Sequence, residues 1–165
     1  MDKERRLEIF SIFIIALSIF VLVSQIGYNP HEEPSISKSV QITNPMGIVG
    51  VFLAHVFIKL GLGYTTILIP MIGLVWGWFL FSKKRLEELK LTTIYLSVLI
   101  LLLSITFGVL IIYFSQNDPD YLISGLIGAN LAKFLIDWIS IYGTSLFLIS
   151  AYLILIRGYF NLDYY

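Results

Sequence analysis

The fold is decided by the stretch Met46–Phe81, MGIVGVFLAHVFIKLGLGYTTILIPMIGLVWGWFLF, which is almost entirely apolar for 36 residues. A helix needs about 20 apolar residues to cross the hydrocarbon core of a bilayer, so this stretch is too long for one crossing. Glycine ends helices at little cost, which places the expected break at Gly61-Leu62-Gly63. The sequence therefore predicts a short helix over 46–60 and a span over 64–81, kinked at Pro70.

A second stretch of the same kind, Tyr121–Ile156, is also too long for one crossing. We expect it to divide near Ile141-Tyr142-Gly143, into a short helix over 122–140 and a span over 144–156. Two uncharged apolar runs of ordinary span length occupy residues 9–26 and 91–114. The predicted fold class is all-α integral membrane, a single domain over residues 1–165. It has four transmembrane helices and, on the outer side, two short interfacial or re-entrant helices.

The composition requires lipid as the solvent for most of this chain. Hydrophobic residues make up 58% of the sequence and charged residues 13%, against about 25% charged residues in soluble domains. A soluble domain of this length could not bury so much apolar surface. The formal net charge is zero, which gives no basic field for nucleic acid. The absence of cysteine excludes disulfides, thiolate metal sites and cysteine nucleophiles within the sequence.

Lysine and arginine predict the orientation, because cytoplasmic loops carry an excess of both. On one side of the expected spans lie Lys3, Arg5, Arg6, Lys83, Lys84, Arg85, Lys90 and Arg157. On the other side lie Lys38, Lys59 and Lys133. This asymmetry places the N-terminus, the central turn and the C-terminus in the cytoplasm.

The two halves of the chain align with each other. Gly47–His55 matches Gly125–Lys133 at an offset of 78 residues, and the same offset pairs Lys59 with Asp137. Each half reads as span, outer loop, short helix and span. Because both halves begin on the cytoplasmic side, the expected repeat is parallel.

The short helices carry two kinds of stripe. Small residues at a spacing of three or four let helix backbones approach closely, so we expect packing or assembly at Gly47, Gly50, Ala54, Gly125, Gly128 and Ala132. A polar stripe, expected to lie toward water at the outer interface, consists of His55, Lys59, Asn130, Lys133 and Asp137.

Two interpretations stay open for the ionisable members of this stripe. They could form a proton or ion path, because ionisable residues within membranes often mark function. They could instead lie at the water boundary, with Lys133 and Asp137 as an i,i+4 pair. The run His31-Glu32-Glu33 could bind a metal, although three consecutive loop residues converge poorly on one ion. No catalytic triad, phosphate-binding loop, cofactor site or metal site is expected from the sequence.

Several motifs resemble one known family. The loop after the first span contains Tyr28, Pro30, Glu32, Glu33 and Pro34 in the segment YNPHEEPS, which resembles a Tyr-x-Pro-x-acidic-Pro-Ser signature of the FtsK/SpoIIIE DNA translocases. The motifs Asn44–Gly50, Trp76-Gly77-Trp78 and Gly125–Gly128 are also similar to the N-terminal membrane domain of that family.

The resemblance implies a non-enzymatic membrane anchor of the bacterial cytoplasmic membrane at the division septum. It also implies hexameric self-association and contacts with other division proteins. ATP, Mg²⁺ and DNA would bind only to a downstream cytoplasmic motor. The main alternative is a free-standing small transporter or channel built from two parallel repeats, which would use His55, Lys59, Lys133 and Asp137. An intramembrane enzyme is a further alternative, but no nucleophile paired with a base supports it.

Overall fold

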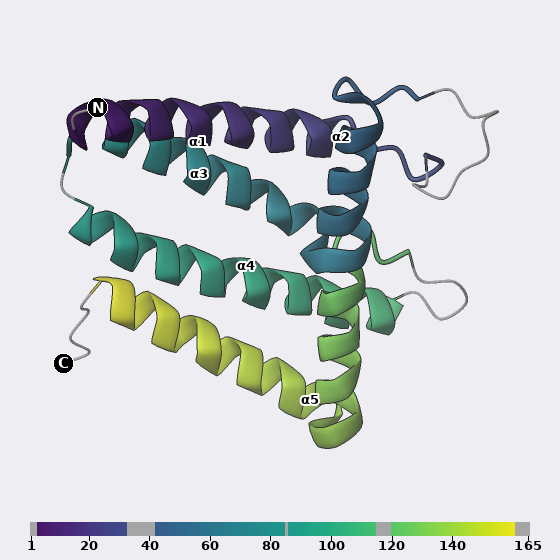
Figure 1. Cartoon of the computed structure of the whole chain (residues 1–165). Coiled ribbons are helices and arrows are strands. Elements are labelled where there is room, and N and C mark those ends of the chain that lie inside the picture. Colours follow the sequence, from purple (N-terminus) through teal and green to yellow (C-terminus); the bar gives the residue numbers. More distant parts are fainter. Residues whose placement is uncertain (1–2, 33–41, 85, 115–119, 161–165) are drawn as a thin grey trace. The chain divides into compact units, whose positions relative to one another are not determined.

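The computed structural model describes residues 3–32, 42–84, 86–114 and 120–160, and these residues form helices and turns with no strand among them (Figure 1). Four helical segments are long and apolar enough to cross a membrane, at Glu4–Ile26, Gly47–Phe81, Leu89–Phe114 and Gly125–Phe160. The elements are α1 (Lys3–Ile26), α2 (Gly47–Ala54), the π-helix η1 (His55–Leu62), the 3₁₀ helix η2 (Gly63–Ile67), α3 (Leu68–Phe81), α4 (Glu87–Phe114) and α5 (Gly125–Phe160). The chain divides into two compact units.

The first unit comprises Met1–Phe57 and Thr66–Leu91. Its helices α1 and α3 lie side by side and run in opposite directions, and α2 crosses one end of α1 (Figure 1). Glycines bring α3 close to α1: a Cβ atom on Gly73 would collide with Ser18, and one on Gly77 would collide with Ile15. Small residues four positions apart allow such an approach between membrane helices.

An ion pair closes the other end of this helix pair. The Lys83 ammonium lies 2.8 Å from a Glu4 carboxylate oxygen and 3.8 Å from one of Glu8. The nearby Glu4 carboxylate raises the pKa of Lys83. Because Glu4 begins α1 and Lys83 follows α3, the N-terminal end of α1 and the C-terminal end of α3 lie on the same side of the first unit.

The second unit comprises Ile58–Thr65 and Thr92–Tyr165. The second half of α5 runs antiparallel to α4, while the first half of α5 crosses one end of α4 (Figure 1). At the opposite end, the rings of Tyr95 and Tyr159 meet edge to face, with centroids 5.4 Å apart. The buried core of this unit consists of Leu102, Ile105, Val109, Ala132 and Leu148.

Helix α5 breaks at Ile139 and Ser140, where the backbone leaves helical geometry. The sequence predicts a division near Ile141-Tyr142-Gly143, and the observed break lies immediately before that segment. The core explains why a kink is needed. In a straight helix Ala132 and Leu148 would lie about 24 Å apart along the axis, yet both pack against α4 in one cluster. Folding α5 at Ser140 brings both halves to the same part of α4.

The stretch Met46–Phe81 leaves helical geometry at Gly61, where the sequence predicts a break, and Gly63 has a positive φ of 73°. The segment between α2 and α3 is wound as η1 and η2 around this break. Pro70 lies in the first turn of α3, where a backbone N–H would have no partner within the helix.

Ser140 has φ 61° and ψ 172°, a combination that only glycine adopts without strain. Replacing Ser140 by Gly should raise the free energy of unfolding by about 1 kcal/mol, because the strain is relieved while the flexibility of glycine costs part of the gain. Denaturant titration in detergent micelles, followed by circular dichroism, measures this change.

The control is Ser150→Gly, because Ser150 is an exposed residue in the regular part of the same helix. It should lower stability by about 0.5–1 kcal/mol. If Ser140→Gly lowered stability as much as Ser150→Gly, the Ser140 backbone would not be strained.

Candidate functional site: a glycine contact and a buried loop anchor

Two backbone segments of the second unit touch without any side chain between them. A Cβ atom on Gly63 would collide with the carbonyl group of Ile123, and one on Gly125 would collide with the carbonyl of Gly61 and the nitrogen of Gly63. The backbone N–H of Tyr64 donates to the carbonyl oxygen of Leu122 over 3.2 Å. We call this arrangement the glycine contact. It fastens residues 61–64 to the chain that enters α5.

The small-residue stripe has different surroundings in the two short helices. A Cβ atom on Gly128 would collide with Ser104 of α4, and one on Gly108 of α4 would lie 2.9 Å from the Ala132 side chain. Gly50 instead lies against Asn44 and Met46, the residues that lead into its own helix. A Cβ atom on Gly47 would meet nothing within 4 Å. Gly125 takes part in the glycine contact, and both Ala54 and Ala132 are fully buried.

Local structure repeats at the offset of 78 residues. Gly47 and Gly125 begin their helices with φ of 64° and 66°. The next turn buries the same positions in each helix, Gly50, Val51 and Ala54 in one and Gly128, Ala129 and Ala132 in the other. Non-helical geometry then follows at Gly61 in one case and at Ile139 in the other.

The polar stripe does not converge on one point. Asn130, Lys133 and Asp137 are exposed along the first half of α5, and His55 and Lys59 are partly buried in η1. The ion pairs seen in the described residues join Lys83 to glutamates of α1, and the expected pair of Lys133 with Asp137 is not among them.

Glu32 organises the loop after α1. It is almost fully buried, and its carboxylate accepts hydrogen bonds from the backbone N–H of Thr43 over 2.9 Å and from the Thr43 hydroxyl. The side-chain amide of Asn29 also donates to it over 3.3 Å, and the backbone N–H of Asn44 donates over 3.4 Å. These bonds close the loop, because they tie residue 32 to residues 43 and 44.

Asn44 joins this loop to α1. Its side-chain amide donates to the carbonyl oxygens of Ser24 over 2.9 Å and Gly27 over 3.1 Å, and its side-chain oxygen accepts from the backbone N–H of Met46. The last carbonyl groups of a helix have no partner within the helix. Asn44 supplies that partner at the end of α1 and then directs the chain toward α2. We refer to Glu32 and Asn44, with their partners, as the loop anchor.

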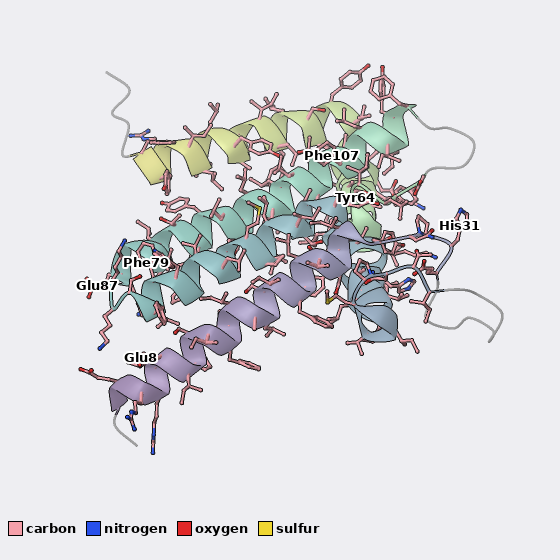
Figure 2. The ribbon with its side chains drawn as sticks, turned by 90° about the horizontal axis from the view of Figure 1, so that it is seen from above. Glu8, His31, Tyr64, Phe79, Glu87 and Phe107 are labelled. Atoms are coloured by element: carbon pink, nitrogen blue, oxygen red, sulfur yellow. The ribbon has the colours of Figure 1, made fainter. Side chains whose placement is uncertain are left out.

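Of the remaining motif residues of this loop, the structure describes Tyr28 and Pro30. Tyr28 is partly buried and Pro30 is exposed, whereas Glu33 and Pro34 fall outside the described residues. His31 is exposed at the edge of the loop (Figure 2), while Glu32 is directed inward. In the described ranges, no three His, Cys, Asp or Glu side chains come together as metal ligands would.

The hydrogen bonds from Thr43 are the main reason that the pKa of Glu32 lies below its ordinary value, although burial acts in the opposite direction. The sequence alone marked Glu32 as a loop residue and did not reveal its partners, since Thr43 follows eleven residues later. The contact of Gly73 and Gly77 with α1 was also missed, although the spacing GLVWG in an apolar helix is a readable signal.

The two helix-starting glycines provide a matched test of the glycine contact. Gly47→Ala should lower the free energy of unfolding by about 1–2 kcal/mol, since only the positive φ is strained. Gly125→Ala has the same strain and also a collision with backbone atoms, which should add about 1–3 kcal/mol. Denaturant titration in micelles distinguishes the two. Equal losses for both variants would mean that the backbones do not touch.

The loop anchor should depend on pH. The pKa of Glu32 is lowered in the folded protein, so the ionised carboxylate stabilises the folded loop. This stabilisation is complete above about pH 4.3, the ordinary pKa of a glutamate, and it is lost as the pH falls through the lower pKa of the folded state. Hydrogen exchange at the amides of Thr43 and Asn44, corrected for intrinsic rates, should therefore accelerate in acid. Glu32→Gln should accelerate exchange at neutral pH and abolish the pH step. A step that persisted in this variant would assign the titration to another group.

Comparison with known proteins identifies the family to which this chain is similar. A family model described as the 4TM region of DNA translocase FtsK/SpoIIIE matches residues 3–165. A protein of Chlorobaculum tepidum named DNA translocase FtsK is 31% identical over 133 residues, which cover 72% of this chain and 16% of that relative. No solved structure matches the chain. The chain thus spans about a sixth of the length of the curated relative that it matches. It belongs to the family of four-transmembrane regions of the FtsK/SpoIIIE DNA translocases.

Proposed function

We propose that this chain is the membrane-anchoring and assembly domain of a translocase for cell division and chromosome segregation. It would hold an ATP-driven motor at the division septum, on the cytoplasmic side of the bacterial inner membrane. The family match over residues 3–165 carries this proposal, together with four helical segments of span length. The sequence has no phosphate-binding loop. ATP, Mg²⁺ and DNA would therefore be bound by the motor.

The proposed orientation has both termini in the cytoplasm. It is supported by the excess of lysine and arginine at the termini and the central turn. The first unit agrees with this, because the ion pair of Lys83 with Glu4 joins the turn to the start of α1. In the second unit, the ring contact of Tyr95 with Tyr159 joins the start of α4 to the end of α5.

The first half of α5 has the three faces that an interfacial helix needs. One face is buried, with Gly128 and Ala132 against α4 and Gly125 in the glycine contact. A second, exposed face is polar and contains Asn130, Lys133 and Asp137. A third, exposed face is apolar and contains Ile127, Leu131, Phe134 and Trp138. With one face on protein, one toward water and one toward acyl chains, this helix suits the outer membrane interface.

The matched φ values, burial and breaks support descent of the two halves from one repeated unit. Self-association is part of the proposal, and a hexamer is expected from the resemblance. In the second unit, Gly125, Gly128 and Ala132 are engaged in contacts within that unit. Exposed span surfaces are therefore the better candidates for contacts between copies. The most apolar part of α5 is only 11% buried, the lowest buried share among the four span-length segments.

A green fluorescent protein fused after Tyr165 tests the proposal with two readouts. Because this reporter becomes fluorescent only when it folds in the cytoplasm, the fusion should glow, and the signal should concentrate at the septum of dividing cells. Fluorescence spread evenly around the cell would remove the septal part of the proposal. A dark fusion that inserts in the membrane would remove the orientation.

Thiol labelling provides an independent control for the orientation. The sequence contains no cysteine, so a cysteine introduced by substitution is the only thiol in this sequence. Asn130→Cys and Lys90→Cys both replace exposed polar residues. A membrane-impermeant thiol reagent should label Asn130→Cys in intact cells, and Lys90→Cys only after permeabilisation. The reverse pattern would contradict the orientation even if the fusion glows.

A further inference from the structure

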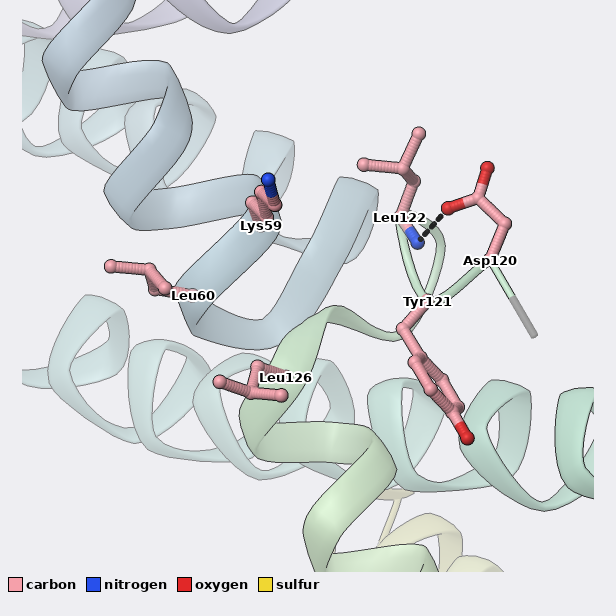
Figure 3. A pocket seen from close by; sticks show the side chains of 6 residues that line it. All are labelled: Lys59, Leu60, Asp120, Tyr121, Leu122 and Leu126. Carbon is pink, nitrogen blue, oxygen red and sulfur yellow. Dashed lines mark hydrogen bonds between the residues drawn. The ribbon is translucent and has the colours of Figure 1, made fainter. Parts of the chain in front are cut away.

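The second unit contains a pocket of about 260 Å³ beside the glycine contact (Figure 3). Two lining residues carry opposite charges, Lys59 and Asp120. Most of the wall is apolar and comes from leucines, and the lining residues are Lys59, Leu60, Asp120, Tyr121, Leu122 and Leu126. In the view of Figure 3 the charged ends of Lys59 and Asp120 lie toward one side, and Leu60 and Leu126 lie toward the other.

Backbone bonds hold the walls of this pocket in place. The glycine contact fixes residues 61–64 against residues 122–125, directly beside Lys59 and Leu60. The Asp120 carboxylate accepts the backbone N–H of Leu122 over 3.1 Å, which sets the turn before α5. The N–H of Gly125 donates to the carbonyl oxygen of Tyr121 over 2.6 Å. The backbone segments that carry the lining residues are therefore held together by hydrogen bonds and close backbone contact.

We propose that this pocket binds the headgroup of a phospholipid that carries a primary amine. The Lys59 ammonium would bind the lipid phosphate, and the Asp120 carboxylate would bind the lipid ammonium group. The leucines would contact the glycerol and the first methylene groups. The proposal rests on the proposed function, which sets the first half of α5 at the outer membrane interface.

The exposure of the leucines supports lipid as the occupant. Leu60 is 43% exposed and Leu126 is 46% exposed, so the apolar wall continues onto the outer surface of the unit. A free phosphate ion would gain nothing from that surface, whereas acyl chains can pack against it through van der Waals contacts. Opposite charges in one pocket suit a zwitterionic headgroup better than an anionic one, because Asp120 repels a purely anionic headgroup.

Native mass spectrometry of the full chain in detergent, titrated with phosphatidylethanolamine, measures the binding. Lys59→Gln should weaken lipid binding about tenfold, the effect of losing one charge-assisted hydrogen bond. The matched control is Lys133→Gln, because Lys133 is an exposed lysine of the neighbouring helix and does not line the pocket. It should leave binding unchanged, and Lys59→Arg should restore most of it. Equal losses in Lys59→Gln and Lys133→Gln would overturn the proposal.

A second variant tests the headgroup. The wild-type chain should prefer phosphatidylethanolamine to phosphatidylglycerol, and Asp120→Asn should abolish this preference while phosphatidylglycerol still binds. Two competitors, inorganic phosphate and soluble glycerophosphoethanolamine, test whether the bound phosphate group belongs to a lipid or to a soluble compound. Neither competitor should displace the lipid at concentrations at which phosphatidylethanolamine itself saturates the pocket. Competition by either would overturn the assignment to a lipid.

The lipid-binding proposal and the proposed function can fail independently of each other. Outward labelling of Asn130→Cys with no effect of Lys59→Gln would reject the pocket alone. Labelling of Asn130→Cys only from the cytoplasmic side would reject the orientation, whatever the lipid data show. Circular dichroism of each variant in the same detergent separates a loss of binding from a loss of fold.

Discussion

In the hydrocarbon core no water is present to bond with the backbone, so every N–H and C=O group must find a partner within the protein. This requirement explains why the connection between α2 and α3 is largely helical. There the chain passes through η1 and η2 and does not open into an irregular loop. The same requirement explains Asn44, whose side chain bonds the last carbonyl groups of α1. Some hydroxyl groups within spans bond the preceding turn, as Thr106 does with Leu102 and Thr144 with Ser140.

Hydrophobic length and glycine placement made the coarse fold readable from sequence. Runs of apolar residues predict spans through a single physical quantity, the thickness of the bilayer. The break at Gly61 was readable because glycine tolerates geometry that other residues do not. The approximate position of the break in α5 was readable too, but the residue that breaks was not, because it depends on where Ala132 and Leu148 meet α4. Ser140 itself gives no local signal, and the nearby Gly143 indicated the region of the break.

Parts of the candidate site could not be predicted from the sequence for a related reason. Glu32 and Asn44 have the composition of ordinary loop residues, and their importance comes from partners distant in sequence. The small-residue stripe was visible as a pattern, but its surroundings were not. Gly128 faces Ser104, whereas its counterpart Gly50 faces the residues that precede its own helix. A stripe of small residues indicates that another backbone can approach the helix closely. Which segment approaches depends on the rest of the fold and is not visible in the stripe itself.

The glycine contact has a consequence for biosynthesis. Residues 58–65 precede α3 in the chain, yet they group with the second unit and bond to residues near 122. They therefore leave the ribosome long before their partners are made. Until residues 121–125 emerge, the segment with Gly61 and Gly63 has no backbone to meet, and the first half of the protein cannot complete its structure. Insertion of the early spans must then be followed by a late docking step, and chains interrupted between α4 and α5 would remain exposed to quality-control proteases.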